Sequence, residues 1–200
     1  MSLRYSIIPV TSYQQNCSLL ICEKTNKAAI VDPGGDIDII LDTLKSKNAI
    51  PEVILVTHGH LDHIGGVGEL AKILSLPIEG PHIEDKFWLD TIPSQIQTFN
   101  FPPCDTFTPS RWLNDGDSIY FGEQQLKVIH CPGHTPGHIV FFHEQSNLAI
   151  VGDVLFKESI GRTDLPKGNF DRLIKSIKNK LWPLGTHIKF IPGHGPMSTF

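Results

Sequence analysis

The chain has 200 residues, of which 40% are hydrophobic and 19% are charged, and its formal net charge is −4. This balance fits a globular protein with a substantial hydrophobic core, so we expect a single domain over residues 1–200. The acidic charge and the lack of a basic block argue against a nucleic-acid partner. No apolar run is long enough for a membrane span, which argues against a membrane partner.

The four cysteines are Cys17, Cys22, Cys104 and Cys131, and none of them forms a CxxC pair. A chain of this size does not need disulfides for stability. The N-terminal residues also show no apolar core of a signal peptide. We therefore expect reduced thiols and a cytoplasmic location.

The first half of the chain is predicted to alternate short strands with helices. The sequence Asp32-Pro33-Gly34-Gly35 breaks the chain sharply after a strand-like run. Asp36 is then predicted to cap a helix whose apolar residues share one face. The predicted strands are 5–10, 18–22, 27–31 and 53–56, and two later helices are predicted over 64–74 and 83–90.

The second half is predicted to be richer in strands. Residues 92–109 show little periodicity, which predicts an irregular loop of the kind that often acts as a lid or binding loop. Because strands and helices alternate irregularly, with hairpins in both halves, two packed β-sheets with helices outside would accommodate the pattern. The predicted strands are 118–121, 125–130, 139–142, 148–151 and 188–191, with one helix over 170–181.

The sequence His58-Gly59-His60-Leu61-Asp62-His63 places three imidazoles and a carboxylate directly after a strand-like run. Both groups are metal ligands, and such a dense cluster is unusual without a metal. On an extended segment, His58 and His60 point to the same side, whereas on a helix they would point apart. The cluster therefore predicts a metal site, with ligands enough for part of a two-ion centre.

Three further strand-like runs end in a potential ligand. They lead to His134, Asp153 and His194, and each ligand lies beside a glycine. Loops just beyond rigid strands often carry active sites, and glycine allows the backbone to turn tightly near a crowded ion. We therefore predict that these three residues complete the site.

These residues resemble the metallo-β-lactamase superfamily, whose HxHxDH signature corresponds to residues 58–63. The resemblance runs from about Ile8 to Pro196. It implies an α/β (α+β) protein with a four-layer αβ/βα sandwich and the metals at one edge. It also implies one ion on His58, His60 and His134, and a second on Asp62, His63 and His194, with Asp153 bridging them.

Within the superfamily, the chain looks like glyoxalase II (hydroxyacylglutathione hydrolase) and its short single-domain bacterial relatives. The sequences at 31–35, 134–138 and 152–156 resemble this group. True β-lactamases usually have cysteine where Asp153 stands, so this aspartate favours the other hydrolases. Six residues follow His194, too few for the C-terminal helical domain of two-domain glyoxalase II.

The resemblance implies a metal-dependent hydrolase that cleaves a small thioester such as S-lactoylglutathione. In this hypothesis two divalent ions convert a water to hydroxide, and the metal-bound hydroxide attacks the thioester carbonyl. Asp62 and Asp153 are the predicted catalytic residues. Zn²⁺ is the expected ion, and the mixed nitrogen and oxygen ligands also suit iron or manganese.

Two further residues each have a predicted role and an alternative. Arg162 could bind a substrate carboxylate through both guanidinium nitrogens, or it could pair locally with Asp164. Asp32 could hydrogen-bond a ligating histidine and so orient it, or it could satisfy its own turn.

A second candidate function belongs to another enzyme class. Gly161-Arg162-Thr163-Asp164 also resembles persulfide dioxygenases. Such an enzyme would hold one Fe(II) on His58, His134 and Asp153, a set of two histidines and one carboxylate. A metal-binding protein without catalysis is disfavoured because every ligand expected of the family is present.

Overall fold

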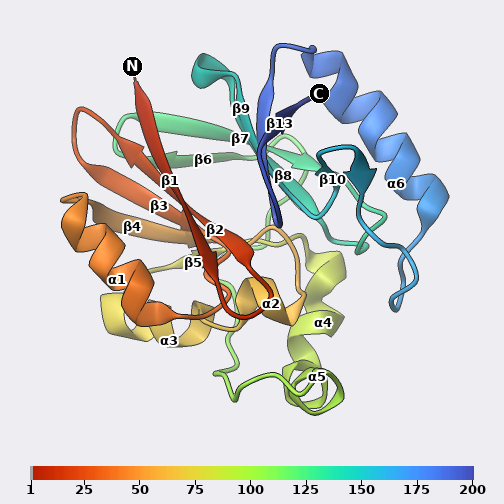
Figure 1. Ribbon diagram of the computed structural model, residues 1–200, viewed down its shortest axis with the longest axis horizontal. Coiled ribbons are helices and arrows are strands. Elements are labelled where there is room, and N and C mark those ends of the chain that lie inside the picture. The colour runs from red at the N-terminus through yellow and green to blue at the C-terminus, as the bar shows by residue number, and fades with distance from the viewer. Residues whose placement is uncertain (1) are drawn as a thin grey trace.

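Residues 2–200, which the computed structural model describes, form two β-sheets that pack face to face with helices on both outer sides (Figure 1). The first sheet has five strands and the second has six. Successive layers are therefore helix, sheet, sheet and helix. This arrangement confirms the predicted four-layer sandwich.

The first sheet has the strand order β1-β2-β3-β4-β5. Its first three strands are antiparallel, while β3 and β4 pair in parallel, as do β4 and β5. Every residue of β2 is buried, and its second half is the continuous apolar run Leu19 to Cys22. The strands are β1 (Leu3–Val10), β2 (Gln15–Cys22), β3 (Lys27–Val31), β4 (Ile50–Leu55) and β5 (Ile78–Glu79).

The second sheet has the strand order β13-β12-β9-β8-β7-β6. Only β9 and β12 pair in parallel within it, so both strands end at the same edge. A small separate hairpin, β10 (Leu155–Phe156) with β11 (Ser159–Ile160), follows β9. The strands are β6 (Ser118–Phe121), β7 (Gln124–His130), β8 (Ile139–His143), β9 (Leu148–Gly152), β12 (Lys189–Pro192) and β13 (Ser198–Thr199).

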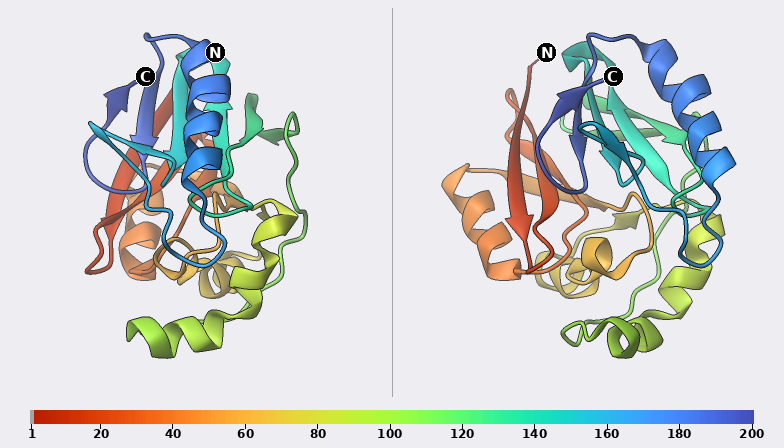
Figure 2. Two further views of the ribbon diagram at one scale, coloured as in Figure 1. Left: turned by 90° about the vertical axis from the view of Figure 1, so that its right-hand side faces the viewer. Right: turned by 45° about the vertical axis from the view of Figure 1, so that its right-hand side comes forward.

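The helices divide between the two outer faces, as the turned views show (Figure 2). Apolar residues of α1 to α5 share one core with the first sheet. A second core lies between the sheets, and a third lies between the second sheet and α6. The helices are α1 (Ile37–Ser46), α2 (Leu61–Ile64), α3 (Val67–Leu74), η1 (Ile83–Asp85), α4 (Lys86–Asp90), α5 (Ile92–Phe99), η2 (Glu144–Ser146), α6 (Phe170–Ser176), η3 (Ile177–Leu181) and η4 (Trp182–Leu184).

None of the helices within residues 2–200 combines the length and the apolar character that a membrane crossing requires.

The helix predicted over 64–74 is in fact two helices, which is a correction to the sequence analysis. α2 starts earlier, at Leu61, and Gly65 and Gly66 separate it from α3. The main-chain N–H of Gly66 donates to Pro33 O at 2.9 Å, and a side chain at either glycine would collide with the 33–34 turn. The close approach of this turn, which is distant in the chain, interrupts the helix.

The loop predicted over 92–109 was wrong for its first half. Residues 92–99 form α5, with Pro93 in the first turn, where its missing N–H costs nothing. The apolar residues Ile92, Ile96 and Phe99 do recur at helical spacing, a short pattern that the sequence analysis missed. Residues 101–109 do lack regular structure, as predicted.

Asp36 precedes α1 as predicted, but its side chain does not cap the helix. Its backbone is left-handed, with φ of 48°, and its carboxylate accepts a hydrogen bond from the N–H of Thr11 at 2.6 Å. The carboxylate therefore ties the β1–β2 turn to the start of α1 instead of capping the helix.

Candidate metal centre

The predicted ligands meet at one edge of the two sheets, because the strands that deliver them end there. His58 and His60 follow β4, His134 follows β7, Asp153 follows β9 and His194 follows β12. The loops beyond these strands bring together side chains that are up to 136 positions apart in the chain. The sequence pattern of strands that end in ligands thus describes a single place in the molecule.

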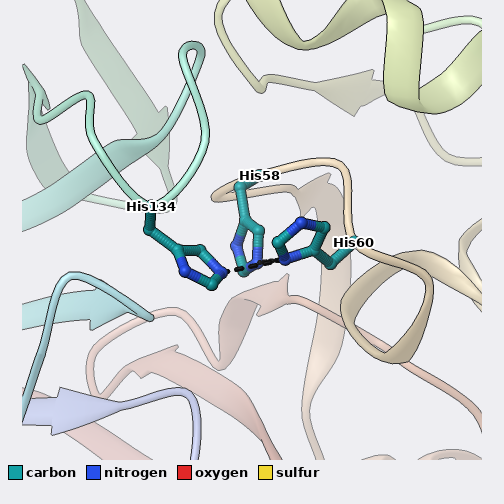
Figure 3. Close-up of side chains that lie close together, drawn as sticks. All are labelled: His58, His60 and His134. Carbon is teal, nitrogen blue, oxygen red and sulfur yellow. Dashed lines mark hydrogen bonds between the residues drawn. The ribbon is translucent and has the colours of Figure 1, made fainter. Parts of the chain in front are cut away.

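The first set of side chains is the three-histidine group of His58, His60 and His134 (Figure 3). His60 Nδ1 lies 3.2 Å from His58 Nε2 and 2.8 Å from His134 Nε2. All three side chains are buried. Burial lowers the pKa of each imidazole, and it lowers that of His60 to about 3. The rings are therefore neutral at pH 7 and have lone pairs to offer a cation.

The second set is the carboxylate–histidine group of Asp62, His63 and His194. His194 Nε2 lies 3.0 Å from Asp62 Oδ2, and His63 Nε2 lies 3.7 Å from the same oxygen. Burial alone would lower the pKa of His63, but the carboxylates of Asp153 and Asp62 raise it well above its ordinary value. Burial would also lower the pKa of His194, but the hydrogen bond to Asp62 raises it above its ordinary value. Without a cation, His63 and His194 therefore keep their protons to a higher pH than an ordinary histidine does.

Asp153 lies between the two groups. Its Oδ2 is 3.6 Å from His134 Nε2 and 3.8 Å from His194 Nε2, while its Oδ1 is 3.3 Å from His63 Nε2. Burial alone would raise the pKa of Asp153, but the neighbouring His63 holds it well below its usual range. The main-chain N–H of Asp153 donates to His138 Nε2 at 3.0 Å, which fixes the turn that carries the carboxylate.

The residues present fit divalent metal ions. Within residues 2–200, His60 Nε2, His63 Nε2 and Asp153 Oδ1 are buried and take part in no hydrogen bond. Gly193 leaves room for the Asp153 carboxylate, because a Cβ at this position would collide with Asp153 Oδ1. Imidazole nitrogens together with carboxylate oxygens suit zinc, iron and manganese. The structure therefore brings all seven predicted ligands together, and their role as ligands stays a prediction.

Asp32 lies behind the ligands and contacts one of them, as one of its two interpretations requires. Its Oδ2 is 2.9 Å from His63 Nδ1 and accepts from the Thr57 hydroxyl at 2.6 Å. Its Oδ1 accepts from the Thr57 N–H at 2.7 Å. Asp32 is also close enough to His58 and His63 to join a ligand set, but these three contacts already occupy its oxygens. The geometry is that of a residue that orients His63.

Asp85 is a site residue that the sequence analysis missed. Its buried carboxylate accepts from the N–H of Gly59 at 2.9 Å, the Thr135 hydroxyl at 2.7 Å and the N–H of Gly137 at 2.6 Å. It thus joins the loop that carries His58 and His60 to the loop that follows His134. Burial raises its pKa to about 6, against the effect of these hydrogen bonds. No local pattern reveals it, because its partners lie 26 to 52 positions away.

Two cavities meet at the ligands. The first, of about 360 Å³, lies under α5, and the second, of about 510 Å³, lies beside the β10–β11 hairpin. His134, Asp153, His194 and Arg162 line both cavities. The guanidinium of Arg162 pairs with both oxygens of Asp164, each at 2.7 Å. Arg162 thus makes the local ion pair of its alternative interpretation at the cavity mouth, and its binding of a substrate carboxylate stays a prediction.

Comparisons with known proteins agree with this geometry. A family model described as the metallo-beta-lactamase superfamily matches residues 10–194. Hydroxyacylglutathione hydrolase GloC of Haemophilus influenzae is 42% identical over 198 residues, which cover 98% of this chain and 93% of the relative.

Two solved structures are also similar over nearly the whole chain. The BLEG-1 B3 metallo-beta-lactamase has a TM-score of 0.90 at 33% identity, covering 98% of this chain and 94% of that one. TTHA1623, solved in a di-iron-bound form, has a TM-score of 0.87 at 31% identity, covering 97% and 94%. Together, the sequence and structure matches confirm the resemblance to this superfamily and to glyoxalase II that the sequence predicts.

Proposed function

Because the chain belongs to the metallo-β-lactamase superfamily as a metallo-hydrolase with glyoxalase II-like relatives, we propose that it holds two divalent ions and hydrolyses a small thioester such as S-lactoylglutathione. The single observation that carries the proposal is the position of Asp153. Its carboxylate faces His134 of the three-histidine group and both His63 and His194 of the other group. A carboxylate between two sets of ligands suits a bridge between two ions.

The ligand sets divide as the family resemblance implies. The three-histidine group would hold one ion and the carboxylate–histidine group would hold the other. When bound, such ions polarise a carbonyl oxygen and lower the pKa of a water toward about 7. The similarity to a structure in a di-iron-bound form supports a centre of this kind.

The other residues hold the centre in place and shape the space beside it. Asp32 orients His63, and Asp85 joins the loops that carry the three histidines, both through buried hydrogen bonds. Asp62 is partly exposed to the cavity under α5, so it can also orient a water there. A thiolate is a good leaving group, so the reaction needs no strong general acid from the protein.

The test combines metal analysis of the purified protein with a hydrolysis assay on S-lactoylglutathione. We expect about two divalent ions per chain and metal-dependent release of the thiol. Activity should disappear after chelation and return on addition of zinc, iron or manganese.

Two parallel assays make the outcome specific. One uses a β-lactam, because a B3 metallo-beta-lactamase is among the similar structures. The other measures oxygen uptake with glutathione persulfide. Hydrolysis of the β-lactam alone, or one iron per chain with oxygen uptake and no thioester hydrolysis, would contradict the proposed function.

A further inference from the structure

The cavity under α5 contains a buried polar side chain that the metal centre does not use. Gln95 is 4% exposed and lines this cavity together with His60, Asp62 and His134. Most of the other cavity-lining residues are apolar or aromatic: Tyr13, Leu61, Phe99, Phe101 and Leu165. Gln95 is thus a buried polar residue beside the ligands, in a cavity whose lining also includes Arg162 and several apolar side chains.

The hydrogen bonds of Gln95 fix which end of its amide is available. Its Nε2 donates to the main-chain oxygen of Trp88 at 2.6 Å and lies 3.5 Å from Thr91 Oγ1. The opposite orientation would bring two acceptor oxygens together, so the assignment of nitrogen and oxygen is firm. The amide oxygen is therefore the end of Gln95 that has no partner among residues 2–200.

That oxygen is buried and accepts no hydrogen bond from any group within residues 2–200. Buried acceptors in proteins nearly always have a donor, because an unsatisfied one is costly. A side chain that fixes its donor end and leaves its acceptor end unpaired beside an active centre is arranged to receive a donor from a ligand.

The two cavities distinguish the two arms of a thioester. The second cavity, beside the β10–β11 hairpin, contains Lys157 and Arg162, which suit a thiol carrier with carboxylates. Arg162 lines both cavities, whereas Lys157 lines only the second one. The smaller cavity under α5 adds the apolar side chains of Leu61, Phe99, Phe101 and Leu165, which suit a short acyl group. A hydroxyl on that acyl group would be the donor that meets Gln95.

We propose that Gln95 is a specificity-determining residue whose amide oxygen accepts a hydrogen bond from a hydroxyl on the acyl group of the substrate. This inference rests on the proposed thioester hydrolysis. It explains why α5 forms one wall of the site, and it assigns the choice of acyl group to this helix.

The test compares two thioesters of one thiol, S-lactoylglutathione and S-propionylglutathione, which differ by one hydroxyl. Gln95→Leu keeps the size of the side chain and removes the acceptor. We expect the wild-type preference for the hydroxyacyl thioester, as a ratio of kcat/KM, to fall by about tenfold in this variant. Any intrinsic difference in reactivity between the two thioesters cancels when the two ratios are compared.

The ratio also separates recognition from a structural role. Loss of the Trp88 contact would lower the activity on both thioesters equally, and partial unfolding would do the same. Gln95→Met serves as a second apolar replacement in case Gln95→Leu does not fold. Gln125→Leu is the matched control, because Gln125 is exposed on β7 and hydrogen-bonds Ser118 away from the site.

Two failures can be told apart. If the wild type hydrolyses both thioesters and both Gln95 variants keep its preference, the assignment of Gln95 is overturned and the proposed function stands. If the wild type hydrolyses neither thioester, the proposed function fails, and the inference about Gln95 falls with it.

Discussion

The two ligand groups differ in how completely the protein has prepared them for a cation. In the three-histidine group, every ring is buried and its pKa is lowered, so the nitrogens are neutral before an ion arrives. In the carboxylate–histidine group, the nearby carboxylates raise the pKa of both histidines, and His194 is partly exposed. An ion must displace protons from the second group but not from the first.

The comparison teaches that burial and charge prepare ligands in different ways. Burial among other histidines keeps an imidazole neutral, while a carboxylate partner stabilises its protonated form. We therefore expect the three-histidine group to hold its ion more tightly, and the following predictions are arranged to challenge that expectation.

The largest effect is expected for Asp153→Ala, because this residue contacts both groups. Its removal takes away the proposed bridge and leaves the histidines without their shared carboxylate. We expect both ions to bind more weakly and kcat/KM for thioester hydrolysis to fall by at least about 10³-fold. Metal content and kinetics measure this, with Asp171→Ala as the control, because Asp171 is exposed on α6. Full activity with full metal content would contradict the bridging role.

Replacing one predicted ligand in each group should show how much each group contributes to metal binding and activity. In His194→Ala, the three-histidine group stays intact, so we expect about one ion per chain and a loss of activity on the order of 10²-fold. In His60→Ala, the better prepared group is broken, and we expect a larger loss, on the order of 10³-fold. Metal analysis with kinetics checks both variants against His187→Ala, which alters an exposed histidine. Equal losses of activity in His194→Ala and His60→Ala would contradict the proposed difference in how tightly the two groups hold an ion.

The aspartates behind the two groups allow a matched comparison of stability. Asp85→Asn replaces one of the two acceptor oxygens by an NH2 group, so either the Gly137 N–H or the Gly59 N–H and the Thr135 hydroxyl lose their acceptor. We expect a loss of roughly 2–4 kcal/mol in the free energy of unfolding of metal-free protein. Asp32→Asn, which affects His63 and Thr57, should have a similar effect on stability but should lower metal content mainly at the carboxylate–histidine group.

Urea unfolding and metal analysis test these two variants. Asp90→Asn is the control, because Asp90 is exposed on α4 and pairs only with Lys86 among the ion pairs described for residues 2–200. If Asp85→Asn unfolds like this control, Asp85 does not brace the ligand loops.

Lowering the pH should remove the ions one after the other. The raised pKa values of His63 and His194 mean that protons compete with the ion at higher pH in the carboxylate–histidine group than in the three-histidine group. As the pH falls below neutrality, we expect metal content to drop from about two ions per chain to about one before it reaches zero. Equilibrium dialysis over a pH series measures this, and simultaneous loss of both ions would contradict the order.

The smallest effect is expected at the Arg162–Asp164 pair, which lies outside both groups. If Arg162 binds a carboxylate of the thiol carrier, Arg162→Ala should raise KM several-fold, by roughly 3–10-fold, with little change in kcat. Asp164→Ala frees the guanidinium and should leave KM unchanged or lower it. A parallel rise of KM in both variants would indicate that only their local ion pair matters.

Much of the fold and of the candidate metal centre could be predicted from the sequence alone. Strands such as β4, β9 and β12 were predicted because buried apolar residues stand together in each of them. The seven ligands were predicted because they follow those strands in a fixed order, and His58 to His63 are neighbours in the chain. The sandwich itself followed from the family resemblance that these residues carry.

Tertiary structure decided the features that depend on contacts between distant residues. The break between α2 and α3 comes from the 33–34 turn. Asp85 and Gln95 have no sequence signature, because their importance comes from partners and cavities that folding brings to them. Functional residues can be predicted from a sequence when they are neighbours in the chain, and secondary structure can be predicted when apolar residues recur at a regular spacing. The hydrogen bonds of Asp85 and the cavity position of Gln95 form only when the helices and sheets pack together, because their partners are distant in the chain.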